Sequence, residues 1–233
     1  MKKTALLLAT ILLFCACNNV REEIIQTYPN GKPMIAILVK GSKKVPVRVG
    51  ERMYYENGQL QFEKTFTGKN EIPDGTWKYY FDNGQLFASA DFSVRHDFGS
   101  RWEFFNRNGG AYYPEKTDSV YVTDMGMFGT PSTVVFCKDN HKDVIQFYSN
   151  YTVRSTERLT DDVRNGRVFF YFPNGLPQVE ANFINGQEDG PYIIYRENGI
   201  PYYQGKYEQG KRVGIWEFYD EQGNLSHTQD YGT

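Results

Sequence analysis

The chain has 233 residues, of which 40% are apolar and 16% aromatic, and its formal charge at pH 7 is −2. This length allows one large β domain or two small ones, and so many aromatic residues are typical of a packed protein rather than a disordered one. No Lys/Arg run or basic face stands out, so the sequence does not indicate a nucleic-acid partner.

The N-terminus has the pattern of an export signal. Two lysines precede an apolar run over 5–14, which is too short to span a bilayer but suits a secretory signal peptide. Ala16 and then Cys17 follow, and this order resembles the bacterial lipoprotein signal, in which the cysteine after the cleavage site receives the lipid. The resemblance implies a signal peptide over 1–16, a lipid on Cys17, and a place in the bacterial cell envelope, at the outer membrane rather than the inner one. An ordinary signal peptide is the alternative.

The next residues, 17–26, are largely polar and predict a short tether. Processing would leave only Cys17 and Cys137, and a lipid on Cys17 would leave no pair for a disulfide. We therefore expect an exported fold that depends on packing alone, with Cys137 as a small buried hydrophobic residue.

An Asn-Gly turn recurs along the chain at nearly constant spacing. Asn-Gly is a strong signal for a type I′ hairpin turn, which needs positive φ at both central residues. The asparagines are Asn30, Asn57, Asn83, Asn108, Asn174 and Asn198, and Gln222 takes this place in a last copy. Neighbouring copies lie 24 to 27 residues apart, except between Asn108 and Asn174. Such regularity indicates a repeated structural unit.

The residues around each turn also repeat, when positions are counted from its asparagine. Large residues stand six and four positions before it, as in Trp77, Tyr79, Trp216 and Phe218. Aromatic residues at position −3 form a second set: Tyr54, Tyr80, Phe105, Tyr171, Tyr195 and Tyr219. Because side chains alternate along a strand, positions −6 and −4 share one face and position −3 lies on the other.

Each unit is therefore a strand, a turn, a second strand and a loop, which together make a β-hairpin of about 24 residues. A lone hairpin is marginally stable in water, whereas stacked hairpins bury a continuous aromatic ladder. We expect an all-β fold, an antiparallel β-meander of hairpins stacked in series. The pattern leaves open whether the sheet stays flat or curls over itself.

The best-preserved copies also resemble a known family. Gly75-Thr76-Trp77 with Tyr80, and Gly214-Ile215-Trp216 with Tyr219, are similar to the MORN repeat, in particular to the bacterial variant found in YwqK-type antitoxin components. The resemblance covers about 28–113 and 163–231, and we expect repeats over 27–113 and 163–233. It implies an antiparallel meander that serves interactions rather than catalysis.

The stretch 114–162 lacks the turn signature. Four of its segments, 119–124, 132–137, 144–149 and 151–156, still have the composition of strands. It is either a set of degenerate repeats or a β insertion, and we expect it to continue the same sheet.

The chain offers little that is typical of catalysis. Its histidines, His96, His141 and His227, lie far apart without the spacing of metal ligands, and no nucleophile elbow is present. We expect no enzyme activity, no metal and no cofactor. The tryptophans are expected in the core. The −3 set of Tyr54, Tyr80, Phe105, Tyr171, Tyr195 and Tyr219 is the candidate interaction face if the sheet is open, because tyrosine favours binding surfaces.

Three functions compete at this point. The first is a non-catalytic, lipid-anchored envelope protein that binds another protein through its repeat face. The second, from the family resemblance, is an antitoxin or immunity protein that neutralises a toxin acting in or on the envelope. The third is a surface lipoprotein that binds glycans by stacking sugar rings on exposed tyrosines.

Overall fold

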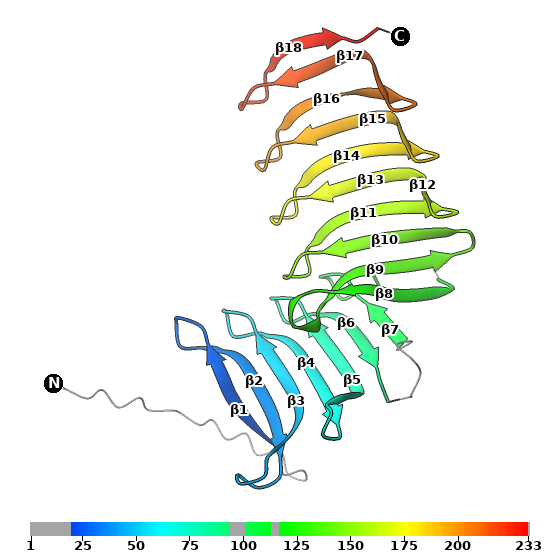
Figure 1. The fold of residues 1–233 in the computed structure, drawn as a ribbon. Coiled ribbons are helices and arrows are strands. Elements are labelled where there is room, and N and C mark those ends of the chain that lie inside the picture. Colours follow the sequence, from blue (N-terminus) through cyan, green and yellow to red (C-terminus); the bar gives the residue numbers. More distant parts are fainter. Residues whose placement is uncertain (1–19, 94–100, 113–116, 233) are drawn as a thin grey trace, which may run out of the picture.

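The computed structural model describes residues 20–93, 101–112 and 117–232, so the predicted signal peptide and Cys17 lie outside the described residues. The described chain forms two antiparallel sheets whose strands mostly follow one another in chain order (Figure 1). This confirms the predicted all-β meander of sequential hairpins. Both sheets are open, so the alternative of a curled sheet was wrong.

The first sheet has seven strands in the described chain. They are β1 (Val20–Thr27), β2 (Pro33–Lys40), β3 (Val47–Tyr54), β4 (Leu60–Thr67), β5 (Ile72–Tyr80), β6 (Leu86–Asp91) and β7 (Arg101–Phe104). Residues 20–26, expected in a tether, instead form β1. They pair with β2 across the Asn30 turn, so the first hairpin starts earlier in the chain than the repeat pattern showed.

The second sheet has eleven strands among the described residues. They are β8 (Ser119–Met125), β9 (Pro131–Lys138), β10 (His141–Phe147), β11 (Val153–Thr160), β12 (Val163–Arg164), β13 (Gly166–Tyr171), β14 (Pro177–Ile184), β15 (Gln187–Tyr195), β16 (Pro201–Glu208), β17 (Lys211–Tyr219) and β18 (Leu225–Asp230). A single 3-10 turn, η1 (Met127–Gly129), connects β8 to β9. The expectation that 114–162 continues one sheet was therefore half wrong: β8–β11 join the C-terminal repeats, and the N-terminal sheet ends at β7.

The turns repeat closely, but they are not type I′. In the first turn, Tyr28 N–H donates to the Lys32 carbonyl and Gly31 N–H donates to the Tyr28 carbonyl, both at 2.9 Å. Only the glycine has positive φ, +80° at Gly31, and the register shifts by one residue between the last pairs of the hairpin. The connection is therefore longer than a two-residue hairpin loop, and it ends in a residue of left-handed conformation beside a β-bulge. Such a loop needs positive φ at one residue only.

One further turn of this kind lies in the central stretch, where no turn signature was found. Tyr148 N–H donates to the Thr152 carbonyl at 2.8 Å, and Tyr151 N–H donates to the Tyr148 carbonyl at 2.9 Å. Tyr151 occupies the glycine position with φ +62°. The turn is centred on Asn150, 24 residues before Asn174, so β10 and β11 are a regular repeat whose glycine is a tyrosine.

We call the side of the −6 and −4 residues the ladder face of each sheet, and the side of the −3 residues the reverse face. The ladder face of the first sheet packs against the reverse face of β9 and β10. One buried core contains Trp77 and Tyr79 from the first sheet together with Phe136, Ile145 and Phe147 from the second.

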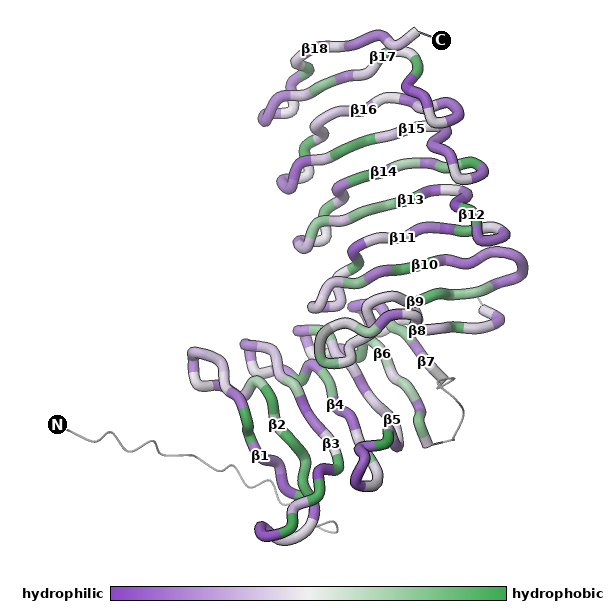
Figure 2. Tube along the Cα trace, viewed as in Figure 1, coloured by the Kyte–Doolittle hydropathy of each residue, from purple (hydrophilic) through white to green (hydrophobic). Residues whose placement is uncertain are grey.

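The turn residue Tyr151 closes this junction. The Tyr151 ring lies parallel to the ring of Phe87, with centroids 4.4 Å apart. Phe147 contacts the Phe87 ring edge-on, with centroids 4.9 Å apart. From this junction β13–β18 extend away from the first sheet (Figure 1). Figure 2 shows hydrophobic residues within the strands and hydrophilic residues at the turns on both edges.

Candidate binding surfaces

The six predicted −3 rings do not form one stripe. Tyr54, Tyr80 and Phe105 belong to the first sheet and its last turn, whereas Tyr171, Tyr195 and Tyr219 lie on the second sheet. All six are half-buried, so they line open reverse faces and form no second core. The junction separates the two sets, because the reverse face of β9 and β10, with Phe147 at its own −3 position, is buried against the first sheet.

Carboxylates of the same chain already hold most of these tyrosines. Tyr54 Oη donates to Glu22 at 2.5 Å, Tyr195 Oη to Glu180 at 3.0 Å, and Tyr219 Oη to Glu217 at 2.7 Å. Burial, and then the hydrogen bond to Glu180, raises the pKa of Tyr195 to about 12. Three of the reverse-face hydroxyls thus already have partners within the chain.

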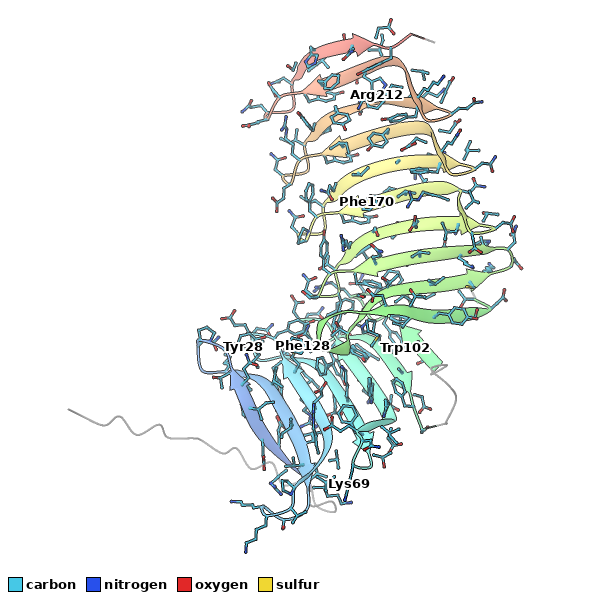
Figure 3. All side chains as sticks on the ribbon, in the orientation of Figure 1. Tyr28, Lys69, Trp102, Phe128, Phe170 and Arg212 are labelled. Atoms are coloured by element: carbon cyan, nitrogen blue, oxygen red, sulfur yellow. The ribbon has the colours of Figure 1, made fainter. Side chains whose placement is uncertain are left out.

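The ladder face of β13–β18 has a different character. Its rings and aliphatic side chains are Val168, Phe170, Val179, Phe183, Tyr192, Ile194, Tyr203, Tyr207, Trp216, Phe218 and Tyr231. The same ladder positions in the first sheet are covered by β9 and β10. None of these residues belongs to the core shared by the two sheets. Figure 3 labels Phe170 on this part of the sheet, and its side chain is 38% exposed. The second sheet therefore presents an apolar, aromatic face without a second layer.

Trp216 is nevertheless fully buried on this face. Its ring lies flat over Gly205 of the neighbouring strand, where a Cβ atom would collide with the indole. Tyr207 packs against the indole edge-on, with ring centroids 5.2 Å apart, and Tyr231 closes the other side at 6.0 Å. Two earlier units have Ala90 and Ala181 at the position of Gly205, so a small residue under the next large ring occurs in three units.

Arg212 covers the side of the Trp216 ring that faces away from the sheet. Its guanidinium lies 4.3 Å from the indole centroid, and its Nη1 donates to Tyr231 Oη at 2.9 Å. A second, longer hydrogen bond of 3.4 Å joins its Nε to Tyr207 Oη. The bonds to the two tyrosines raise the pKa of Arg212. An open cavity of about 510 Å³ lies beside this cluster and is lined by Arg212, Lys211, Tyr231, Asp189, Glu208, Gln209 and Val213.

Lys64 is a second cation that the repeat pattern missed. It takes the place of Ala90 and Ala181 in its own unit and is buried at the junction. Its Nζ lies 4.2 Å from the Phe62 ring centroid and 5.2 Å from that of Trp77, and it donates to the Phe128 carbonyl in η1. Burial lowers the pKa of Lys64 to about 8, although Glu51 at 3.5 Å opposes this. Its sequence signal was a lysine at the position where three other units have Ala90, Ala181 and Gly205.

The turns are also linked to one another along the edge of each sheet. At position −2, Tyr28, Tyr55, Tyr148 and Arg196 each donate a side-chain hydrogen bond to the carbonyl of the −3 residue in the next unit. The last turn of each sheet differs. Asn106 and Asp220 stand at −2 there, and each accepts backbone N–H groups of its own turn. The series of bonds is also interrupted inside each sheet, because Phe81 and Phe172 stand at −2 and phenylalanine has no donor.

No group of three or more His, Cys, Asp and Glu side chains that could hold a metal occurs in the described part of the chain. Cys137 is half-buried and its thiol is free, whereas a buried position was expected. In the ranges that the structure covers, no helix has the length and apolar character needed to cross a membrane. The features described above are surfaces suited to binding, and they consist of aromatic rings, carboxylates and cations.

A comparison with protein families found three matches within this chain. The model for the MORN repeat variant matches residues 50–67, 73–93 and 164–185, which correspond to β3–β4, β5–β6 and β12–β14. A comparison with curated proteins found no match. The chain is therefore a β-repeat protein, and three of its segments are similar to the MORN repeat variant.

Proposed function

We propose that this chain is a non-catalytic protein of the bacterial cell envelope, anchored by a lipid on Cys17, and that its second sheet binds another protein. The observation that carries the proposal is the uncovered ladder face of β13–β18. The first sheet hides the same kind of face beneath β9 and β10. An apolar face of this extent, rimmed by polar residues, is typical of an interaction site.

The ladder face is a better candidate than the reverse face. The reverse-face hydroxyls of Tyr195 and Tyr219 are used within the chain, whereas the Phe170 side chain on the ladder face is 38% exposed. Aromatic residues and arginine are enriched at the centres of protein interfaces, and Trp216 with Arg212 lies on this face.

The proposed anchor fits this arrangement. Cys17 precedes β1 by three residues, which span about 10 Å at most. A lipid on Cys17 would hold the first sheet near the membrane, while β13–β18 extend away from that sheet (Figure 1). A Cys17→Ala variant should move from the membrane fraction to the soluble fraction. Retention of the variant in membranes, with unprocessed precursor as the main wild-type species, would argue against the anchor.

The binding function is tested by affinity capture from mildly cross-linked cells, with proteins identified by mass spectrometry. One reproducible partner is expected with the wild type, and it should be lost in Phe170→Ser. The matched control is Ile215→Ser, since Ile215 is a 63% exposed apolar residue on the reverse face. A partner that is a secreted toxin would specify an immunity protein. Loss of the partner in Tyr195→Ala and Tyr219→Ala, but not in Phe170→Ser, would move the site to the reverse face.

A further inference from the structure

Arg212 differs from the arginines of the first sheet in the partners of its guanidinium. Arg21, Arg52 and Arg107 each contact a carboxylate oxygen, at 2.7, 2.6 and 2.5 Å. Within residues 20–93, 101–112 and 117–232, Arg212 has no such partner and is held by two tyrosine hydroxyls and the Trp216 ring. Stacking and hydroxyl bonds fix the plane of the guanidinium without neutralising its charge.

The acidic groups at the adjacent cavity, Asp189 and Glu208, make no ion pair with Arg212 within the described residues. Glu208 is ion-paired with Lys206 at 2.6 Å, and Asp189 accepts the backbone N–H of Gln209 at 3.3 Å. Lys211 adds a second cation to the cavity wall. The cavity therefore has a fixed guanidinium on one side and a lysine beside it, while Glu208 has a lysine partner and Asp189 keeps its charge.

Trp216, on which Arg212 lies, has an unused hydrogen-bond donor. Its side chain is fully buried, yet its indole Nε1–H has no hydrogen-bond partner. Trp77, at the same repeat position in the first sheet, donates Nε1–H to the Thr65 carbonyl at 2.8 Å. A buried donor without a partner is costly, and native structures rarely keep one without a reason.

We propose that the cluster of Arg212, Trp216 and Tyr231 binds a carboxylate supplied by an acidic segment of the protein partner. A guanidinium takes a carboxylate through two parallel N–H···O bonds, and its flat stacking on Trp216 sets the orientation in advance. Arg and Trp are also among the residue types that dominate binding energy in protein interfaces. This inference rests on the proposed binding function and names the chemistry of the partner at that surface.

The test uses the full chain and a blocked, fluorescein-labelled octapeptide of alternating Glu and Ser, with a Gln/Ser octapeptide as the neutral control. Fluorescence anisotropy at low salt should show at least tenfold tighter binding of the acidic peptide. Arg212→Gln should lose at least tenfold in affinity for it. Arg154→Gln is the matched control, because Arg154 is an exposed arginine on β11 of the same sheet, and its affinity should be unchanged.

A conservative variant guards against a folding effect, since Arg212 also covers Trp216. Arg212→Lys keeps the charge but not the planar fork, and it should bind the acidic peptide several-fold more weakly with an unchanged near-UV spectrum. Equal binding of the two peptides, or wild-type affinity in both Arg212 variants, would overturn the carboxylate site.

The peptide assay needs no partner, so its failure is distinct from a failure of the capture experiment. A partner captured equally by the wild type and by Arg212→Gln would leave protein binding intact and overturn the role of Arg212. Tighter binding of an oligogalacturonate than of the acidic peptide, lost in Arg212→Gln, would overturn the assignment to a protein, because the carboxylate would then come from a glycan.

Discussion

Lys64 departs from the repeat because its side chain makes contacts at the junction between the two sheets. In three other units Ala90, Ala181 or Gly205 lies beneath the next large ring, whereas the Lys64 side chain passes under Trp77 and reaches the Phe128 carbonyl. A buried ammonium loses hydration that one carbonyl, ring faces and Glu51 replace only in part. The charged form is therefore held at a cost to stability.

This cost predicts an unusual pH profile. The pKa of Lys64 falls from 10.5 in the unfolded chain to about 8 in the fold. Above pH 8 the folded state releases a proton that the unfolded state keeps, so the free energy of unfolding should rise, by up to about 3 kcal/mol. Above pH 10 it should fall again, because burial raises the pKa of Tyr79 and the unfolded tyrosine ionises first. Urea denaturation from pH 7 to 11 measures the free energy of unfolding. Lys64→Met should abolish its rise above pH 8. A rise that persists in this variant would show that another group causes it.

Gly205 is the residue on which the Trp216 packing depends. Gly205→Ala should destabilise the chain by about 1–3 kcal/mol, because its Cβ would force the indole away. Trp216→Ala should cost about 3–5 kcal/mol. In a Trp216→Ala background the alanine at 205 should cost less than about 1 kcal/mol, and a double-mutant cycle in urea checks this coupling. Additive costs would mean that the two residues do not pack together.

At the scale of the hairpin, sequence spacing located most units because one glycine at positive φ is needed in each turn. The unit at Asn150 was missed since Tyr151 holds that conformation despite its side chain, and its ring is buried against Phe87. The end of the first sheet was missed as well. A short polar residue stands at −2 in the last turn of each sheet, Asn106 in the first and Asp220 in the second, and this difference is visible in the sequence.

At Tyr151, glycine should destabilise the chain less than alanine does, which is the reverse of the usual order in a strand. Both Tyr151→Ala and Tyr151→Gly lose a buried ring and should cost about 3–5 kcal/mol. Tyr151→Gly should be the less damaging by about 1 kcal/mol, because glycine adopts φ +62° without strain. Chemical denaturation of both variants compares them. Greater stability of the alanine variant would show that the turn relaxes to a different backbone conformation.

At the scale of the whole molecule, the two sheets differ in how many layers protect them. β4–β6 are covered on one face by β9 and β10, whereas β15–β17 have no second layer. The backbone amides of β15–β17 should therefore exchange with deuterium at least tenfold faster than those of β4–β6. Exchange measured by mass spectrometry on the full chain tests this. Equal protection would indicate that the second sheet is covered, for instance by another copy of the chain.

The packing of the two sheets against each other could not be predicted from the sequence. Period-two alternation separates residues into two faces, but it does not say which face meets which sheet. The ladder face of the first sheet meets the reverse face of the second, so Phe147 is buried at a −3 position while Tyr195 at another stays open. The candidate site changed for the same reason, because the −3 rings are split by the junction and the uncovered aromatic surface is the ladder of β13–β18.

The most direct test of a binding ladder face is photo-cross-linking in intact cells, with a photoreactive phenylalanine analogue placed at Phe170 and, separately, at Ile215. The two positions lie on opposite faces of the second sheet and are both exposed. We predict a cross-link from position 170 to a single protein and none from position 215. A cross-link from 215 alone, or none from either position, would contradict binding through the ladder face.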